Sequence, residues 1–520
     1  MGSQKQLIGP VDGPASCRCL RAAKRCMALL LLLAPLMVSC GGALTPTPQP
    51  VVVPVTLSAA DVNSVVQQAA QSVNVPLVIA VVDRLGNVLA LLTEPGAPAT
   101  AQGDFGQTVD TRDLAISLAR TGAFFSNDQA PLSSRTVRFI SGVHFPPGVT
   151  NAANAALYGI ENTNRGCPLD PSLVPGIQVA LTRSFNGAAL GLGIATGKAD
   201  TNDSDPNAVN PGGVPLFKSG QLVGGVGIAG VAPDVAEFAA SSAAAGAGFG
   251  AAPAPPGVVV IDGISLPFIN QTTRPSSVGA GAPIVFSAGI AGTAPPDGDI
   301  LPPKAGTVGG LTQADVQTIV NNSVATAQVT RAVIRLPPGL RTRMSIAVAD
   351  LDGTLLALHR MPDSTVFSID VAVSKARNLA YFSSAAGAAD LPGMPPGTAV
   401  TNRTISFGAQ PFFPPGINGS GTGPFFNLYL NDVAHPCTQG SQPANANQSG
   451  IVFFPGSVPL YKNGVLVGGL GISGDGVDQD DYVANGGSAG FEAPAAIRAD
   501  QVIIQGVRMP YLKFPRNPTD

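Results

Sequence analysis

The sequence contains no tryptophan and only three histidines among its 520 residues. Histidine supplies many of the metal ligands and acid–base groups of proteins, so its scarcity limits these chemistries before any motif is sought. Neither a Cys-x-x-Cys-His motif for covalent haem nor a cluster of histidine and cysteine for zinc is present. Carboxylates spaced for acid–base catalysis and a repeated Ser-His-Asp order are also absent, which argues against a hydrolase.

Charged residues are scarce as well, at 12% of the chain, with 29 Lys and Arg against 32 Asp and Glu. The formal net charge of −3 gives no basic footprint for nucleic acid, so we expect no nucleic-acid partner. The 62 glycines and 48 prolines make up about a fifth of the 520 residues. This composition predicts many turns and long irregular connections, with strands rather than long helices between them.

Residues near the amino terminus are typical of an export signal. Basic residues between positions 21 and 25 precede an apolar run over 27–38. This run of about 12 residues is too short to span a bilayer as a helix and suits the core of a signal peptide. Ser39 and Cys40 follow, and together with the end of the run they resemble a bacterial lipobox.

The lipobox resemblance implies cleavage before Cys40 and attachment of lipid to its thiol and new amino terminus. No aspartate follows Cys40, which in this pattern favours the outer membrane. We therefore expect a lipoprotein signal over 1–40 and a Pro-rich tether over 41–56. The chain would meet the membrane through its lipid alone, on the periplasmic or outer side. An ordinary secretory signal that happens to contain a cysteine is the alternative.

The chain contains a tandem duplication. Residues 214–230 read VPLFKSGQLVGGVGIAG, and residues 458–474 read VPLYKNGVLVGGLGISG. Residues 79–86 and 346–353 match in the same way, and all matches keep the same order in both halves. We predict one domain over 57–270, a second over 311–515, and a linker rich in Gly, Pro and Ala over 271–310.

Each copy has the same predicted plan: a helix, a β-hairpin, a second helix, a long polar excursion and a closing hairpin. Hairpins with helices packed on them predict an α+β fold with an antiparallel sheet rather than a parallel one. The excursions are long insertions over 126–213 and 383–455. Lys218 and Lys462, at the turns of the closing hairpins, are expected to be solvated.

The closing hairpins contain a Gly-x-Gly-x-x-Gly pattern at 225–230 and again at 469–474. A dinucleotide fold needs this pattern after the first strand of a βαβ unit, with an acidic residue about 20 positions further on. Here the pattern lies late in each copy and closes a hairpin. The glycines therefore indicate close approach of a helix or a neighbouring strand rather than a nucleotide site.

Cysteine use fits export. Of the six cysteines, three precede Cys40 and would leave with the signal. Cys167 and Cys437 remain, at matching places in the two copies. In an oxidising compartment they could form one disulfide that joins the copies, and two unpaired thiols are the alternative.

The second copy resembles the GlcG/HbpS-like family, which also includes the carboxyl-terminal domain of PduO-type proteins. The residues that carry the resemblance are the hairpin at 347–357, the segment at 360–364, the helix at 368–377 with Lys375, and the Gly-rich segment at 456–474. The first copy departs from the pattern, since Leu118 stands where Lys375 does. The resemblance implies two profilin-like α+β domains, a tendency to form homo-oligomers and, for some members, haem binding with roles in haem handling or redox sensing.

The resemblance directs attention to three neighbouring residues. His359 ends a hairpin strand and is of the type that ligates haem iron. Arg360 could pair with a propionate, and Met361 could line an apolar pocket. The alternative is that His359 is an exposed hairpin-end residue. Arg403, repeated as Arg135, either contacts an anion such as a propionate or bonds loop carbonyls.

Three functions are compatible with these observations. The first is an exported, non-catalytic lipoprotein that binds haem or another small ligand. The second is a structural or protein-interaction scaffold that uses the long insertions. The third is an enzyme acting on a small oxidised metabolite, which the lack of a repeated catalytic cluster disfavours. A haem site needs an apolar slot with an iron ligand and a cation at its rim, whereas a scaffold needs a broad exposed patch.

Overall fold

A computed structural model describes residues 54–169, 193–197, 205, 207–250 and 259–520. The predicted lipoprotein signal with Cys40, and most of the predicted tether, lie outside these residues. In the part of the chain that is described, no helix combines the length and the apolar character needed to cross a membrane.

The first copy folds as one antiparallel sheet with helices on both faces. Its strand order is β2-β1-β6-β5. Its elements are α1 (Ala59–Ser72), β1 (Val78–Asp83), β2 (Val88–Thr93), β3 (Thr100–Gln102), η1 (Asp104–Gly106), β4 (Thr108–Asp110), α2 (Thr111–Phe125), α3 (Ser134–Phe139), η2 (Ile160–Asn162), β5 (Gly213–Lys218), β6 (Gln221–Ala229), α4 (Pro233–Gly246), β7 (Val260–Ile261) and β8 (Ile264–Ser265).

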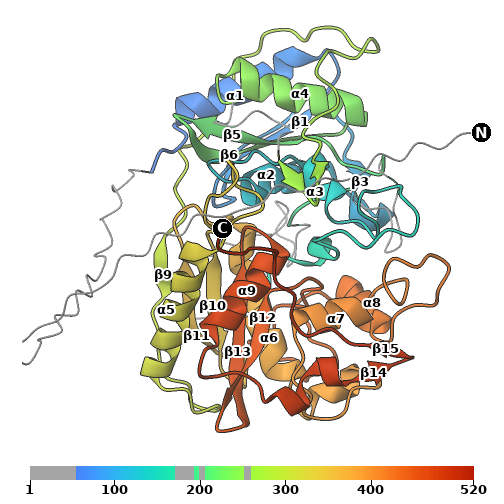
Figure 1. The fold of residues 1–520 in the computed structure, drawn as a ribbon. Helices are drawn as coiled ribbons and strands as arrows, with labels where there is room; N and C mark the ends of the chain where they lie inside the picture. Colours follow the sequence, from blue (N-terminus) through green and yellow to red (C-terminus); the bar gives the residue numbers. More distant parts are fainter. Residues whose placement is uncertain (1–53, 170–192, 198–204, 206, 251–258) are drawn as a thin grey trace, which may run out of the picture. The chain divides into compact units, whose positions relative to one another are not determined.

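The alternation of side chains along β1 explains the layers of this copy. Val78, Ala80 and Val82 pack with α2, while Ile79 and Val81 pack with α1 and α4 on the other face. Figure 1 shows the same arrangement, with α1 and α4 together over one face and α2 beneath the other.

The second copy repeats this architecture. Its sheet order is β12-β13-β10-β11-β9, in which the first four strands correspond to β5, β6, β1 and β2. Its elements are β9 (Gly298–Leu301), α5 (Gln313–Val329), β10 (Ser345–Ala349), β11 (Leu355–Arg360), α6 (Phe367–Phe382), η3 (Gly387–Asp390), α7 (Asn402–Gly408), α8 (Phe426–Ala434), β12 (Ser457–Lys462), β13 (Val465–Ser473), α9 (Val477–Gly487), η4 (Ala495–Ile497), η5 (Ala499–Gln501), β14 (Ile503–Ile504) and β15 (Val507–Arg508). The predicted α+β fold in two tandem copies is confirmed, and the bounds of the two domains stay a prediction.

The predicted linker over 271–310 is built into both copies. The backbone of Gly279 accepts a hydrogen bond from Asn74, and Ile290 donates one to Leu89. Further along, strand β9 pairs with β11 at the edge of the second sheet. The segment therefore extends the packing of each copy.

The turn lysines, which were expected to be solvated, are partly exposed, and each also forms an ion pair. Lys218 Nζ lies 2.5 Å from Asp61 Oδ2, and Lys462 Nζ lies 2.8 Å from Asp315 Oδ2. Each aspartate also closes the capping box of its helix, α1 or α5. A closing hairpin is thus tied to the first helix in both copies.

The repeated glycines mark the closest approach of a helix to the sheet. A Cβ placed on Gly469 or Gly471 would lie 2.1 or 2.0 Å from a backbone oxygen of α6. In the first copy, Gly225 and Gly227 meet backbone oxygens of α2 at 2.1 and 2.0 Å in the same way. The prediction of close helix approach is confirmed, and the helix covers the face on which these glycines lie.

The two copies share one apolar core. The described residues all belong to one unit, residues 53–520. Phe125 at the end of α2 stacks on Phe367 at the start of α6, with ring centres 4.2 Å apart. Buried residues of both sheets and of α2 and α6 belong to the same hydrophobic cluster. The predicted disulfide between Cys167 and Cys437 is also formed, with an S–S distance of 2.02 Å.

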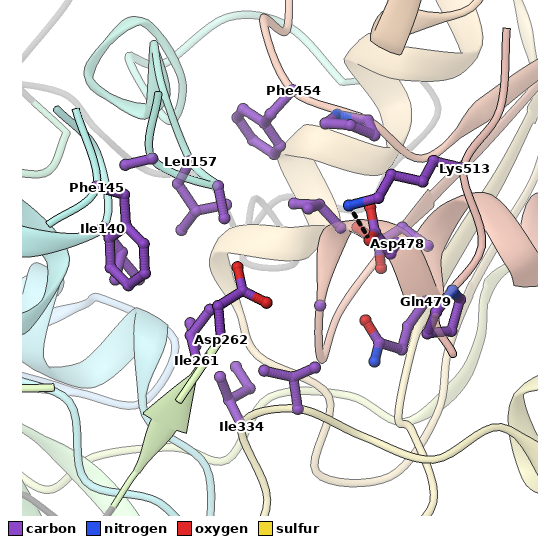
Figure 2. A pocket seen from close by; sticks show the side chains of 18 of the residues that line it. Ile140, Phe145, Leu157, Ile261, Asp262, Ile334, Phe454, Asp478, Gln479 and Lys513 are labelled. Carbon is purple, nitrogen blue, oxygen red and sulfur yellow. Dashed lines mark ion pairs between the residues drawn. The ribbon is translucent and has the colours of Figure 1, made fainter. Parts of the chain in front are cut away.

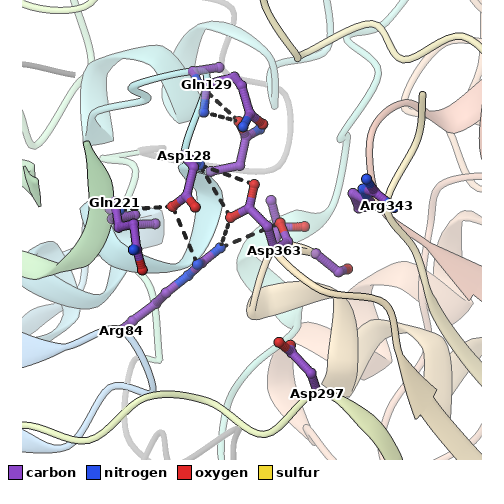
Figure 3. A network of polar contacts seen from close by, with 12 residues as sticks. Arg84, Asp128, Gln129, Gln221, Asp297, Arg343 and Asp363 are labelled. Atoms are coloured by element: carbon purple, nitrogen blue, oxygen red, sulfur yellow. Dashed lines mark hydrogen bonds and ion pairs between the residues drawn. The ribbon is translucent and has the colours of Figure 1, made fainter. Parts of the chain in front are cut away.

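Buried charges also join the copies, and Figure 3 shows part of them. Arg84 of the first copy and Arg335 of the second each lie 2.5 Å from a carboxylate oxygen of Asp363. Arg335 also pairs with the buried Asp475, and Asp128 donates its backbone N–H to Asp363 at 3.2 Å. We call these five residues the inter-repeat network. Burial would raise the pKa of Asp363, but the two arginines lower it to about 2.

Candidate functional site

A cavity of about 850 Å³ lies between the two copies. Its size falls in the range of roughly 300–1,000 Å³ that is typical of small-molecule sites. Both copies contribute to its wall, so it exists only because the repeats are packed against each other. Its described apolar side chains include Phe125, Ile140, Phe145, Leu157, Ile261, Ile334, Phe367, Phe407, Phe454 and Phe514.

The two sides of the cavity differ in character, as Figure 2 shows. Ile140, Phe145 and Leu157 come from the first insertion, and they form an apolar side. Asp478 and Lys513 lie on the opposite side, in the second copy. A ligand that fits this cavity therefore has an apolar body and a polar edge.

The described residues that line the cavity include four cationic and three acidic side chains. This set is Arg331, Arg403, Lys513 and Arg516 with Asp262, Asp478 and Asp480. Lys513 is 68% exposed and lies 2.8 Å from Asp478. Because the ammonium group of Lys513 is exposed, an anionic group of a ligand can pair with it in addition to Asp478.

Arg403 is the one residue of the predicted haem set that lines this cavity. Its Nε lies 2.5 Å from Asp481, and a terminal nitrogen lies 2.6 Å from Asp478. Arg135 makes the same kind of pair with Glu237 at 2.6 Å. The repeated arginines therefore bond carboxylates of the last helix of each copy, rather than the loop carbonyls considered from the sequence.

A second ion pair lies in the wall close to Arg403. Lys375 Nζ donates to the backbone oxygen of Ile472 at 2.7 Å and to Asp480 Oδ2 at 3.1 Å. Both side chains are buried, and Nζ lies 5.0 Å from the ring centre of Phe454. Burial lowers the pKa of Lys375 and raises that of Asp480 to about 7.

Asp480 is the feature of this site that sequence reasoning missed. It lines the cavity, and its Oδ1 is buried without a hydrogen-bond partner among the described residues. The available signal was a difference between the copies: the position of Lys375 holds Leu118 in copy one, and that of Asp480 holds Ala236. Both members of a charged pair are thus absent together from the first copy.

His359 does not line the cavity between the copies. Its Nδ1 lies 2.7 Å from Asp299 Oδ1, on the neighbouring strand β9. It lines a hollow of about 270 Å³ beside α5, with polar Gln317 and Gln328 among the lining residues. This hollow is smaller than the roughly 300 Å³ at which small-molecule sites begin.

Arg360 and Met361 do not form a common pocket with His359. Because side chains alternate along a strand, Arg360 lies on the opposite face of the sheet from His359. Arg360 is buried and bonds Asp297 and the backbone oxygen of Ser364. Met361 is buried in the core beneath α5. The structure therefore does not bring the four predicted haem residues together.

The cavity suits the porphyrin ring of haem, but its described lining lacks the side chains that usually ligate haem iron. Its volume, apolar side and cations suit a porphyrin with carboxylates at one edge. Haem iron is usually held by histidine, cysteine, methionine or tyrosine, and none of these is among the described residues that line the cavity. The described residues also contain no group of three or more His, Cys, Asp or Glu placed to hold a metal ion.

Comparison with known proteins supports the resemblance seen in the sequence. Residues 311–489 match the family described as haem degrading protein HbpS-like. The corrinoid adenosyltransferase PduO of Salmonella typhimurium LT2 is 27% identical over 157 residues, which are 30% of this chain and 34% of that protein. PduO of Citrobacter freundii is 27% identical over 164 residues, 30% of this chain and 35% of that protein. The match thus spans about a third of these curated relatives.

Two solved structures are also similar. A crystal structure of a PduOC:heme complex has 22% identity and a TM-score of 0.23, and covers 35% of this chain and 94% of that chain. A crystal structure of Klebsiella pneumoniae protein ORFY has 20% identity and a TM-score of 0.23, and covers 34% of this chain and 88% of that chain.

Proposed function

We propose that the chain binds haem or a related small ligand, non-covalently, in the cavity between its copies; the match of residues 311–489 to the HbpS-like family supports this. The observation that carries this proposal is the cavity of about 850 Å³ with one apolar and one charged side. A complex with haem is described for the similar PduOC structure, which supports haem-class ligands as the first to test.

The described residues suggest how such a ligand would be held. Its apolar body would lie against Phe145, Leu157 and Phe454, which removes apolar surface from water. Its carboxylates would meet Lys513 and Arg516 of the carboxyl-terminal segment. This chain's residues would bury the ring of the ligand and position its acidic edge.

We propose further that the chain is an exported lipoprotein, anchored through Cys40 to the outer membrane and otherwise facing the periplasm or the cell surface. The disulfide between Cys167 and Cys437 supports an oxidising compartment. We also propose a non-catalytic role in haem handling or redox sensing, which the family resemblance implies. Self-association of the chain stays a prediction.

The scaffold alternative finds less support in the described insertions. Tyr158 and Tyr429, one from each insertion, are buried and stack with ring centres 4.9 Å apart. Arg377 of α6 donates to the backbone of Pro168 at 2.6 Å. The described insertions therefore use their large side chains within the chain, which leaves fewer of them for an external partner.

Titration of the full chain with hemin in detergent tests the ligand proposal. We expect a saturable, stoichiometric shift of the Soret band. Ile261 lines the cavity while its neighbour Val260 is 43% exposed, so the two form a matched pair on strand β7. Ile261→Trp should extend a larger side chain into the cavity and weaken hemin binding by about tenfold or more, which corresponds to about 1.4 kcal/mol.

Val260→Trp and His359→Ala should bind hemin as the wild type does, because neither residue lines the cavity. Absence of a saturable shift would remove the proposal. Loss of binding in His359→Ala, with Ile261→Trp unaffected, would move the site to the hollow beside α5.

A further inference from the structure

The carboxyl-terminal segment of the chain supplies two of the cations that line the cavity, Lys513 and Arg516. The backbone N–H of Lys513 donates to Asp481 at 3.1 Å, and the backbone oxygen of Arg516 accepts a hydrogen bond from Arg331 at 3.2 Å. Arg331 lines the cavity as well. We call residues 513–516 the cationic strap. These bonds hold the backbone of the strap at both of its ends, beside the cavity.

The charges of the strap are only partly neutralised within the chain. Lys513 is 68% exposed and shares Asp478 with Arg403. Among the described residues, no carboxylate pairs with Arg516 or with Arg331. Guanidinium groups bind carboxylates and phosphates through charge-assisted hydrogen bonds, so these two arginines are available to an anionic group of a ligand.

A carboxylate of the first copy lies across the cavity from Lys513. Asp262 is at the tip of the β7–β8 hairpin, where it lines the cavity and is exposed. Figure 2 shows its carboxylate pointing toward the middle of the cavity, on the side of Ile261. No cation among the described residues pairs with it. The cavity therefore has a positive edge at the strap and a negative group on the side of the first copy.

The first copy contains the same segment as the cationic strap. The backbone N–H of Asn270 donates to Glu237 there, as that of Lys513 donates to Asp481. The two segments therefore match at an offset of 513 − 270 = 243 residues. The hairpins that precede them, β7–β8 and β14–β15, match at the same offset.

The charges that line the cavity are not repeated at these matched positions. Each charged residue has an uncharged counterpart in the other copy: Lys513 and Asn270, Arg516 and Thr273, Asp262 and Gln505. Asp262 and Gln505 have φ angles of 50° and 51°, so the turn is formed with or without the charge. The fold therefore does not require these three charges, and their common place along the cavity points to a ligand.

We propose that the cavity selects ligands whose acidic groups all lie on one edge of an apolar body. The strap and Arg331 bind that edge, and Asp262 repels an acidic group at the other edge. Both effects are stronger in a cavity that excludes water than in bulk solvent. This inference rests on the proposed function, because it takes the cavity as the ligand site. Haem has this pattern of acidic groups, whereas a porphyrin with carboxylates on opposite edges does not.

Three iron porphyrins that differ in their acidic groups test the selection: hemin, iron coproporphyrin III and hemin dimethyl ester. Hemin has two carboxylates on one edge, the coproporphyrin has two more on the opposite edge, and the diester has none. Each is titrated into the full chain in detergent and followed by absorbance. We expect hemin to bind about tenfold more tightly than either of the others, which corresponds to about 1.4 kcal/mol.

Asp262→Gln tests the negative group. The variant takes the residue that the second copy has at the matching turn, so it should fold. It should raise the affinity for iron coproporphyrin III by about threefold or more and change that for hemin by less than about twofold. Gln505→Asp is the matched control, because it adds a charge at an exposed turn that does not line the cavity. It should bind all three probes as the wild type does.

The double variant Lys513→Asn/Arg516→Thr tests the strap with the residues of the first copy. It should weaken hemin binding by about tenfold and change binding of the diester by less than about twofold. Because salt screens exposed charges, hemin affinity should fall with ionic strength in the wild type and less so in this variant.

The outcomes separate this inference from the proposed function. If none of the three porphyrins binds saturably, the proposed function fails. If hemin binds but the diester and the coproporphyrin bind as tightly, the cavity function stands and the selection is wrong. If the double variant weakens hemin and the diester equally, the strap only shapes the cavity. If Asp262→Gln leaves the preference for hemin over the coproporphyrin unchanged, the role given to Asp262 is wrong.

Discussion

Replacing Gly471 by alanine is expected to prevent the second copy from folding stably. The added Cβ would lie 2.0 Å from the backbone oxygen of Ala372 and 2.6 Å from the backbone nitrogen of Ala376. Both atoms belong to the main chain of α6, which is buried along its whole length and cannot move aside as a side chain can. We expect a loss of about 3 kcal/mol or more, at or above the upper end of ordinary overpacking.

Urea or thermal unfolding followed by circular dichroism measures this loss. Gly421→Ala is the matched control, because a Cβ at Gly421 meets nothing within 4 Å. It should change stability by no more than about 0.5 kcal/mol, as for most surface substitutions. If Gly471→Ala unfolds at the same urea concentration or temperature as Gly421→Ala, α6 does not lie on β13 as described.

The glycine pattern illustrates what could be predicted from the sequence. The position of Gly225 and Gly469 late in each copy indicated the close approach of a helix, which the structure shows. The capping boxes at Ser58 and Thr312 are equally local, because each joins residues three positions apart. Features that depend on a few neighbouring residues were therefore within reach.

The grouping of His359 with Arg360 as one site could have been avoided from the sequence alone. His359 and Arg360 are adjacent in sequence, which made them look like one site. Adjacent residues of a strand point to opposite faces, and the structure gives His359 a partner in Asp299 and Arg360 one in Asp297. The period of the strand was already visible in the hairpin.

The cavity itself could not be predicted, because it depends on how the two copies meet. Its wall joins residues as distant as Phe145 and Lys513. The inter-repeat network is of the same kind, since Arg84 and Asp363 are 279 positions apart. Without an observed packing of one copy on the other, the sequence holds no signal that brings these residues together.

Replacing Asp363 by asparagine is expected to loosen the two copies and to abolish the cavity as a binding site. Asp363 has a φ of 62°, a conformation that asparagine also tolerates. The substitution therefore changes the charge of the side chain without straining the backbone. The substitution leaves Arg84 and Arg335 without the carboxylate that both of them contact. Removing one partner from a buried ion pair costs about 3–5 kcal/mol. Arg335 keeps Asp475 and Arg84 keeps Asp128 at 3.6 Å, so we expect a loss at the lower end of this range.

Unfolding in urea and the hemin titration together measure this effect. Arg112→Ala is the control. Arg112 pairs with Asp110 at 2.7 Å, and its side chain is 38% exposed. Exposed pairs contribute about 0–1 kcal/mol, so the control should keep both stability and ligand affinity. If Asp363→Asn lowers stability but binds ligand as the wild type does, the ligand site does not lie between the copies. If it changes neither, Asp363 does not hold the two copies together.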